Sequence, residues 1–437
     1  MSSFLRKLET TVTGGAILIG IASLCSRLLG LVRDRLLSSQ IGPGDILDSY
    51  YVAFRLPDFI FNILILGAVS SAFIPVFIEL WHKQDSSSKD QKDAWNLVNN
   101  LLSIFVVSLS VLAALGIVFA GNIVPIFAPG FHGEKLMMSI TMTRIMLLSI
   151  MLFGISNVLS SILNSLKRFF AFAFAPVFYN IGIIIGISML YPRIGYVGLA
   201  WGIVIGALLH LLLQLPAVYR LGYRFRLQLQ PRQHSVRNVF RLMVPRTVGL
   251  GAIQIDQTVS TMIASTLAVG SVSIFSLANN LANVPISLFG ISLAIASFPV
   301  FSEMLAAQQI GKFALEFSKV FRRILFFTIP VTVLFLLLRA HIVRLILGSG
   351  KFGWDDTILT AQSLGFLSLS LFAQSLIPML ARSFYALQDT KTPVTISVLA
   401  VVMNIIGGLL LGPILGVQGL ALSFSSASTV QRFLLLL

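Results

Sequence analysis

The sequence has 437 residues, of which 56% are hydrophobic and 11% are charged, and its formal net charge is +15. Because soluble domains carry about 25% charged residues, this composition excludes a soluble globular protein and indicates an integral membrane protein with many spans. The single cysteine, Cys25, excludes an intrachain disulfide and a thiolate metal cluster.

Long apolar segments follow one another along the whole chain. A membrane-spanning helix needs roughly 20 mostly apolar residues. We expect helices over 12–38, 46–80, 94–126, 136–165, 170–191, 195–218, 238–268, 271–305, 318–347, 358–387, 393–412 and 416–437. The first segment continues through Arg27 and Arg33 without a signal-peptidase site, so we expect it to stay uncleaved. The predicted fold is an all-α integral membrane protein with about twelve transmembrane helices.

The basic residues predict the orientation of these helices. With the N-terminus in the cytoplasm, most Lys and Arg residues fall in inner loops or their flanks, as the positive-inside rule requires. The most basic connector, "YRLGYRFRLQLQPRQHSVRNVFR" (219–241), lies near the middle of the chain and could rest on anionic lipid headgroups. This distribution explains the net charge without a nucleic-acid partner.

Three pairs of segments indicate an internal repeat at an offset near 221–224 residues. "AFIPVFIEL" (72–80) is similar to "ASFPVFSEM" (296–304), "YNIGIIIGI" (179–187) to "MNIIGGLLL" (403–411), and "IGYVGLA" (194–200) to "LGVQGLA" (415–421). We therefore expect two pseudo-symmetric six-helix lobes, 1–218 and 238–437, joined by a cytoplasmic linker, 219–237. An even number of helices in each lobe implies a pseudo-two-fold axis along the membrane normal, with the binding site at the repeat interface.

Polar side chains recur at helical spacing inside the apolar segments. Ionisable residues at that depth are costly and usually face a bundle interior or a hydrated cavity. Because an Arg fork binds phosphate or carboxylate bidentately, we expect an anionic substrate. The candidate substrate-binding residues are Ser26, Arg27, Arg33, Asp34, Asp48, Arg55, Asp58, Asn62, Asn180, Arg246, Gln254, Asp256 and Asn280. Two alternatives stay open: Asn and Ser stripes can serve as interhelical hydrogen-bond glue, and Arg33, Asp34 and Arg35 can snorkel or pair near the helix end.

Motifs for catalysis or for cofactor binding are missing from the sequence. "GSGKFGWDD" (348–356) lacks the spacing and the Ser or Thr of a phosphate-binding loop, and no H-E-x-x-H motif occurs. We therefore expect no enzyme activity, no cofactor and no metal site.

Three stretches resemble the MurJ (MviN) family of the MOP transporter superfamily. They are "SRLLGLVRDRLLSSQIG…DILDSYYVAFRLPDFIFNILILGAVSSAFIPVFIE" (26–79), "FSLANNLANVPISLFGISLAIASFPVFSE" (275–303) and "LARSFYALQDTKTPV" (380–394). The resemblance implies a monomeric, MATE-like bacterial inner-membrane transporter that flips lipid II, an undecaprenyl-pyrophosphate-linked peptidoglycan precursor, by alternating access. Its family motifs match Ser26–Arg27, Arg33–Asp34, Asp48 and Arg55.

The chain departs from the family pattern at several positions. Phe61 and Asn62 stand where family members often have an Arg pair, Leu66 replaces a Glu, and Asn280 replaces an Arg. The family usually has two further helices, so the chain looks truncated at its C-terminus. Alternatives are a flippase for another polyprenyl-linked oligosaccharide, a MATE-like drug or cation antiporter, or a membrane scaffold that transports nothing.

Overall fold

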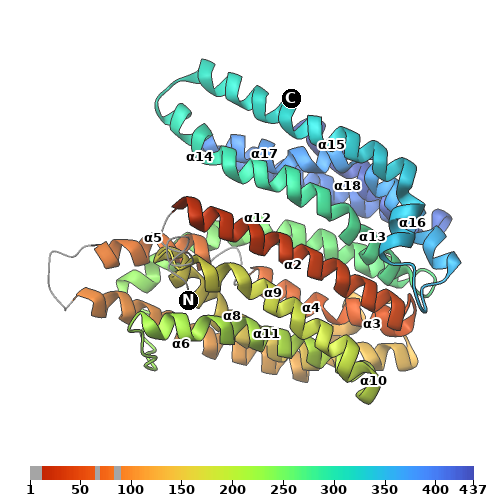
Figure 1. The fold of residues 1–437 in the computed structure, drawn as a ribbon, viewed down its shortest axis with the longest axis horizontal. Coiled ribbons are helices and arrows are strands. Elements are labelled where there is room, and N and C mark those ends of the chain that lie inside the picture. Colours follow the sequence, from red (N-terminus) through yellow and green to blue (C-terminus); the bar gives the residue numbers. More distant parts are fainter. Residues whose placement is uncertain (1–11, 64–68, 83–89) are drawn as a thin grey trace. The chain divides into compact units, whose positions relative to one another are not determined.

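The computed structural model describes residues 12–63, 69–82 and 90–437, and every regular element in these ranges is helical (Figure 1). The first elements are α2 (Val12–Gln40), α3 (Asp45–Ala53), α4 (Arg55–Phe61), α5 (Val69–His82), α6 (Asp90–Val118), α7 (Ala120–Phe127), α8 (Gly133–Ser165), α9 (Phe169–Ile185), η2 (Gly186–Leu190), α10 (Tyr191–Ile194) and α11 (Tyr196–Arg220). They are followed by α12 (His234–Ser265), α13 (Ser271–Pro285), η3 (Ile286–Ile291), α14 (Ser292–Ala306), α15 (Ile310–Ile346), α16 (Trp354–Ser368), α17 (Leu371–Ala386), α18 (Lys391–Leu415) and α19 (Val417–Leu434).

The all-helical membrane fold predicted from the sequence is confirmed. In the described part of the chain, seven helices are long and apolar enough to cross a membrane, and the α16–α17 pair, bent by 45°, would make an eighth. All of the predicted segments contain helix. The number of twelve crossings stays a prediction, as does the expected truncation.

Several predicted helices are interrupted in the structure. The segment 46–80 contains α3, α4 and α5, and 94–126 breaks between α6 and α7. The segment 271–305 turns into the π-helix η3 directly after Pro285. Proline removes a backbone hydrogen bond and crowds the preceding turn, so a change of helical geometry at this position is expected.

The chain divides into two compact units. Unit 1 comprises Met1–Leu37, Val52–Phe127 and His132–Gln254, and unit 2 comprises Ser38–Tyr51, Ala128–Phe131 and Ile255–Leu437. The lobe boundaries given by the sequence repeat stay a prediction.

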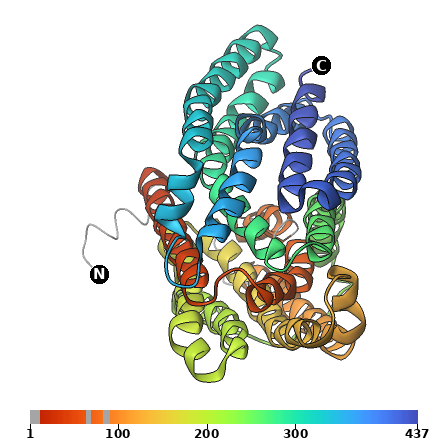
Figure 2. The same cartoon turned by 90° about the vertical axis from the view of Figure 1, so that its right-hand side faces the viewer.

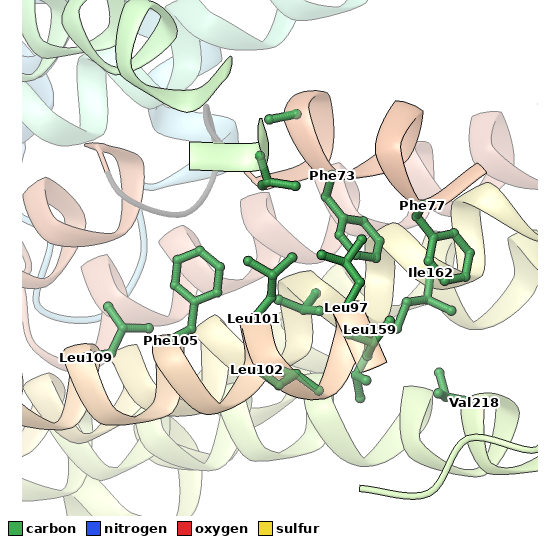
Figure 3. Close-up of a cluster of buried hydrophobic side chains, with 14 of the residues drawn as sticks. Phe73, Phe77, Leu97, Leu101, Leu102, Phe105, Leu109, Leu159, Ile162 and Val218 are labelled. Atoms are coloured by element: carbon green, nitrogen blue, oxygen red, sulfur yellow. The ribbon is translucent and has the colours of Figure 1, made fainter. Parts of the chain in front are cut away.

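The core of unit 1 forms where α5, α6, α8 and α11 pack together (Figure 3). Leu97, Leu101 and Phe105 follow one another at a spacing of four on α6 and are all buried. This spacing places them on one face of the helix. They pack with Phe73 and Phe77, whose rings stack with centroids 5.2 Å apart.

Glycines set the contact between α9 and α11 in unit 1. A Cβ atom on Gly182 would lie 2.2 Å from the Cα of Gly206, and one on Gly186 would lie 2.4 Å from the Cα of Gly202. Because only glycine permits this approach, the two backbones touch directly, which is a common way to join helices in membranes. This contact fixes the position of Asn180 on α9, two residues before Gly182.

Unit 2 contains a bundle formed by α15, α16, α17 and α19, with α18 packed along α19 (Figure 2). Phe301 of α14, Ile324 of α15 and Met379 of α17 are fully buried in a shared apolar cluster. On α15 many large apolar side chains are exposed, including Phe326, Leu337 and Leu345. This is expected of a helix that faces lipid.

Local backbone conformations repeat between the two units. Gly195, before α11, has φ 64° and ψ −152°, and Gly416, before α19, has φ 64° and ψ −144°. Lys167 and Gln388 both adopt positive φ directly after α8 and α17. Because both pairs are separated by the same interval as the sequence similarities, these conformations support the predicted repeat.

Part of the basic connector is held against α6. The Oδ1 atom of Asn99 accepts hydrogen bonds from the Arg226 amide (3.0 Å) and the Tyr223 hydroxyl (2.8 Å). Asn100 Oδ1 accepts from the Gln230 amide (2.8 Å), and its Nδ2 donates to the Gln230 carbonyl (2.7 Å). Side chains of a helix therefore satisfy the backbone of this nonhelical segment, as a neighbouring strand would.

Candidate functional site

Four predicted site residues form one hydrogen-bonded network in unit 1. The Arg33 guanidinium donates from Nε (2.9 Å) and Nη2 (2.8 Å) to Asp34 Oδ1, and from Nη1 (3.4 Å) to Asn180 Oδ1. Asn180 Nδ2 donates to Ser26 Oγ at 3.2 Å. The network joins α2 to α9, which the sequence separates by about 150 positions.

Burial in this network differs between the ion-pair partners. The Asp34 side chain is 4% exposed, whereas the Arg33 side chain is 25% exposed. A carboxylate this deeply buried must be paired, and Arg33 supplies the pair. Arg33 is therefore held in one orientation by Asp34 and Asn180, and a quarter of its side chain stays exposed. A preoriented guanidinium is suited to an anion if its exposed part includes N–H groups. Arg27, two turns earlier on α2, is half-buried.

The predicted residues on α4 border a cavity. Asp58 lies one helical turn after Arg55, whose positive charge acts on its carboxylate. Asn62 Nδ2 donates to the Asp58 backbone carbonyl at 2.9 Å, so this amide closes the end of the helix. The cavity has a volume of about 400 Å³, and α4, α8, α9 and α11 supply most of its wall.

Most of the cavity wall is apolar and aromatic, with a small polar portion. The apolar lining consists of Phe54, Pro57, Phe61, Ile150, Phe153, Phe172, Pro176 and Ile203. The polar lining consists of Asp58, Ser149, Asn157, Ser160, Tyr179 and His210. Ligand sites commonly combine a hydrophobic wall with a few placed polar groups.

Asp48 has a structural contact in unit 2. Its Oδ2 accepts a hydrogen bond from the Gly270 amide, and its Oδ1 accepts from the amide and the hydroxyl of Ser273, all at 2.8 Å. Asp48 is 1% exposed. The carboxylate therefore caps the N-terminus of α13 from a distant part of the sequence. A substrate contact by Asp48 stays a prediction.

A second amide network lies in unit 2. Asn404 Nδ2 donates to Asp256 Oδ1 at 2.7 Å and to Ser260 Oγ at 3.3 Å, which connects α18 to α12. Ser423 Oγ donates to the Asn404 carbonyl at 2.8 Å and adds α19. Asn404 follows Asn180 by the repeat interval, so each unit uses an equivalent amide to join its helices.

The remaining predicted residues occupy separate places. Gln254 on α12 is buried, and Asn280 on α13 is half-buried. The side chain of Arg246 and the whole of Leu66 lie outside the described residues. Within the described part of the chain, no group of three or more His, Cys, Asp or Glu residues could hold a metal ion.

Sequence reasoning missed the polar wall of the cavity. Ser149, Asn157 and Ser160 follow one another at spacings of eight and three on α8, which was an available signal. It was weak because Ser and Asn are common in membrane helices without lining a cavity. His210, which also lines the cavity, makes side-chain contacts with Ser156 and Gln214.

Comparison with known proteins assigns the chain to a family. The family model described as lipid II flippase MurJ matches residues 37–437. The chain belongs to the MurJ family.

Relatives across the family support this membership. A probable lipid II flippase MurJ of Buchnera aphidicola subsp. Acyrthosiphon pisum is 32% identical over 95% of this chain and 81% of its own length. The lipid II flippase MurJ of Burkholderia cenocepacia is 29% identical, with the same coverage. A solved lipid II flippase MurJ in an inward closed conformation superposes with a TM-score of 0.83 at 27% identity, covering 96% of this chain and 87% of that one.

The MurJ fold is shared with a wider group of transporters. An inward-facing MATE family multidrug resistance transporter of the MOP superfamily gives a TM-score of 0.79 at 15% identity, over 93% of this chain and 92% of that one. At this identity the similarity concerns the fold alone. It agrees with the MATE-like architecture predicted from the sequence.

Proposed function

We propose that this chain flips lipid II across the bacterial cytoplasmic membrane by alternating access. Family membership supports this function, and the Arg33 network supports a site for the substrate's diphosphate. The substrate is anionic, so an accessible cation held in one orientation gives the specific attraction that recognition requires.

The geometry at Arg33 gives this residue a different role from Arg27. Asp34 and Asn180 hold the Arg33 guanidinium, so little side-chain entropy is lost when an anion binds. Arg27 and Arg55 would add charge from the same unit. The opposing charge of Asp34 lowers the net charge of the pair, so binding depends on the exposed edge of the guanidinium rather than on long-range attraction.

Complementation of a strain depleted of its own lipid II flippase tests this proposal. Arg33→Gln is expected to abolish growth while the protein still accumulates in the membrane. Arg33→Lys keeps the charge but loses the planar fork, so we expect partial growth. Arg193→Gln is the matched control, because Arg193 is exposed on α10 and its side chain donates to the Met189 carbonyl of η2, one turn earlier.

Two results would separate the binding role from a role in folding. Loss of growth with a normal amount of protein, and loss of flipping in proteoliposomes, support substrate binding by Arg33. Wild-type growth and flipping rates for Arg33→Gln, Arg27→Gln and Arg55→Gln would refute the site. Failure of the wild-type chain to complement would refute the function.

The proposal includes a monomeric, multi-pass protein with its N-terminus in the cytoplasm. The distribution of Lys and Arg supports this orientation. Because Cys25 is the single cysteine, Cys25→Ser gives a background for labelling. A cysteine at Ser318 should react only from the cytoplasm, and one at Ser349 only from the periplasm. The reverse pattern would overturn the orientation.

A further inference from the structure

The Asp58 carboxylate borders the unit 1 cavity, and none of the described residues donates a hydrogen bond to it. Among the described residues, hydrogen bonds at Asp58 involve its backbone atoms and not its carboxylate. Arg55 acts on it through charge alone. An ionised carboxylate in a membrane helix is costly unless it is paired, hydrated or protonated. The group therefore needs a partner beyond the side chains that the structure describes.

The cavity offers room for water beside this carboxylate. A volume of about 400 Å³ holds on the order of ten waters at the molecular volume of the liquid. Ser149, Asn157 and Ser160 supply polar partners on the opposite helix, α8. Water can therefore reach Asp58 and carry protons to and from it.

His210 is fixed as a neutral group by its neighbours. Ser160 Oγ donates to Gln214 Oε1 at 3.1 Å, which leaves the Gln214 amide nitrogen facing His210 Nδ1 at 3.4 Å. An amide NH₂ can only donate, so Nδ1 must be the acceptor nitrogen, and the ring proton lies on Nε2. With the Gln214 amide in this orientation, protonation of Nδ1 would place two donors against each other, which disfavours the charged ring. The contacts of His210 therefore favour its neutral form.

The other groups around the cavity leave Asp58 as its proton acceptor. Among the described residues, the titratable or charged side chains are Arg55 and Asp58 on α4, Tyr179 on α9 and His210 on α11, and the lining residues of α8 include none. Asp58 is the carboxylate of this set.

We propose that the cavity bordered by α4, α8, α9 and α11 is a proton-binding site, in which Asp58 exchanges one proton with water during transport. The proton passes from hydronium to the carboxylate, leaving water and a neutral carboxylic acid. The reverse step returns it to water. The exchange rests on the chemistry of the cavity, whereas its place in transport rests on the proposed function.

Proton binding at Asp58 would change the charge available at Arg55. An ionised Asp58 offsets the positive charge of Arg55 one turn away on the same helix. Protonation of Asp58 removes this offsetting negative charge, which favours a bound diphosphate. Because linkage is reciprocal, binding of an anion would also favour uptake of the proton.

Infrared difference spectra of the full chain in nanodiscs, recorded between acid and neutral pH without substrate, test the proton site. We expect a protonated carboxyl band that disappears in Asp58→Asn. Asparagine resembles the neutral acid in shape, so this variant should fold. Asp256→Asn is the matched control, because Asp256 is also in a membrane helix but accepts a hydrogen bond from Asn404. His210→Gln should keep the band.

Three results would overturn the proposal. The band could persist in Asp58→Asn, it could disappear in Asp256→Asn instead, or sodium at constant pH could remove it, which would identify an alkali-cation site. In transport, the wild-type rate should vary with pH by up to about tenfold per unit for one proton, and Asp58→Asn should flatten this dependence. A chain that flips nothing but keeps the Asp58 band would refute the function and leave the proton site standing.

Discussion

Asp48 allows a direct test of the structural contact seen in unit 2. Its carboxylate accepts three hydrogen bonds of 2.8 Å, from the Gly270 amide and from the amide and hydroxyl of Ser273. Asp48→Ala removes both acceptor oxygens and leaves two buried backbone donors at the start of α13. Each unsatisfied donor costs about 1–3 kcal/mol, and a lost N-cap costs about 0.5–2 kcal/mol.

The cost of the unsatisfied donors and the cost of the lost N-cap overlap, because the cap consists of the same hydrogen bonds. Both costs are partly offset, since the variant no longer buries a charge. We therefore expect Asp48→Ala to lower the free energy of unfolding by about 2–4 kcal/mol. Asp48→Asn keeps one acceptor oxygen, and we expect a loss of about 1–2 kcal/mol. For a unit of about 200 residues, the loss expected for Asp48→Ala corresponds to a fall in Tm of roughly 4–16 °C.

Equilibrium unfolding in mixed micelles, followed by circular dichroism, measures these differences. Asp355→Asn is the control, because Asp355 is an exposed acid in the first turn of α16 and should cost at most about 1 kcal/mol. Ser273→Ala completes a double-mutant cycle with Asp48→Asn, and a coupling of at least 0.5 kcal/mol is expected for residues in contact.

The cap would be refuted by an Asp48→Ala protein that unfolds within about 0.5 kcal/mol of the wild type. Additivity of Asp48→Asn and Ser273→Ala would refute the specific contact. A loss of flipping without any loss of stability would indicate a substrate role for Asp48 instead.

Three further predictions follow from other contacts. Gly202→Ala places a Cβ 2.7 Å from the Gly186 Cα and should destabilise the protein by about 1–3 kcal/mol in a thermal unfolding assay. Gly121→Ala is the control, because a Cβ on Gly121 meets open space, and it should be neutral or slightly stabilising in the same assay. Asn100→Ala removes two hydrogen bonds to Gln230 and should speed limited trypsin cleavage of segment 223–233 by about 5–30-fold; an unchanged rate would contradict this. The pKa of Asp389 is lowered because the Thr392 side chain and amide donate to its carboxylate. The stabilising effect of the ionised carboxylate should therefore be complete above about pH 4 and disappear as the pH falls through the lowered pKa. Below that pKa, wild type and Asp389→Asn should unfold at the same midpoint.

Hydropathy alone was enough to find the helical segments of this chain. Their breaks were harder to predict, because Pro285 introduces a π-helix while Pro176, in an equally apolar segment, lies within regular α9. The outcome depends on how neighbouring helices satisfy the freed backbone groups, which a single segment does not encode. The repeat was visible for a different reason: positions such as Gly195 and Gly416 need the same backbone conformation in both units, and few residues tolerate it.

The sequence analysis lists four acids together as candidate substrate-binding residues, but the structure gives them four different environments. Asp34 pairs with Arg33, Asp48 caps α13, Asp256 accepts from Asn404, and Asp58 borders a cavity. Helical spacing identifies the face of the helix on which an acid lies. The chemistry of the acid depends on its partners. For Asp34, Asp256 and Asp48 these partners lie between one and more than two hundred residues away in the sequence. Pairing, capping and amide contacts satisfy three of these carboxylates within the protein. Asp58 differs because it lines a cavity and none of the described residues donates to its carboxylate, so we expect its charge to change without breaking the fold.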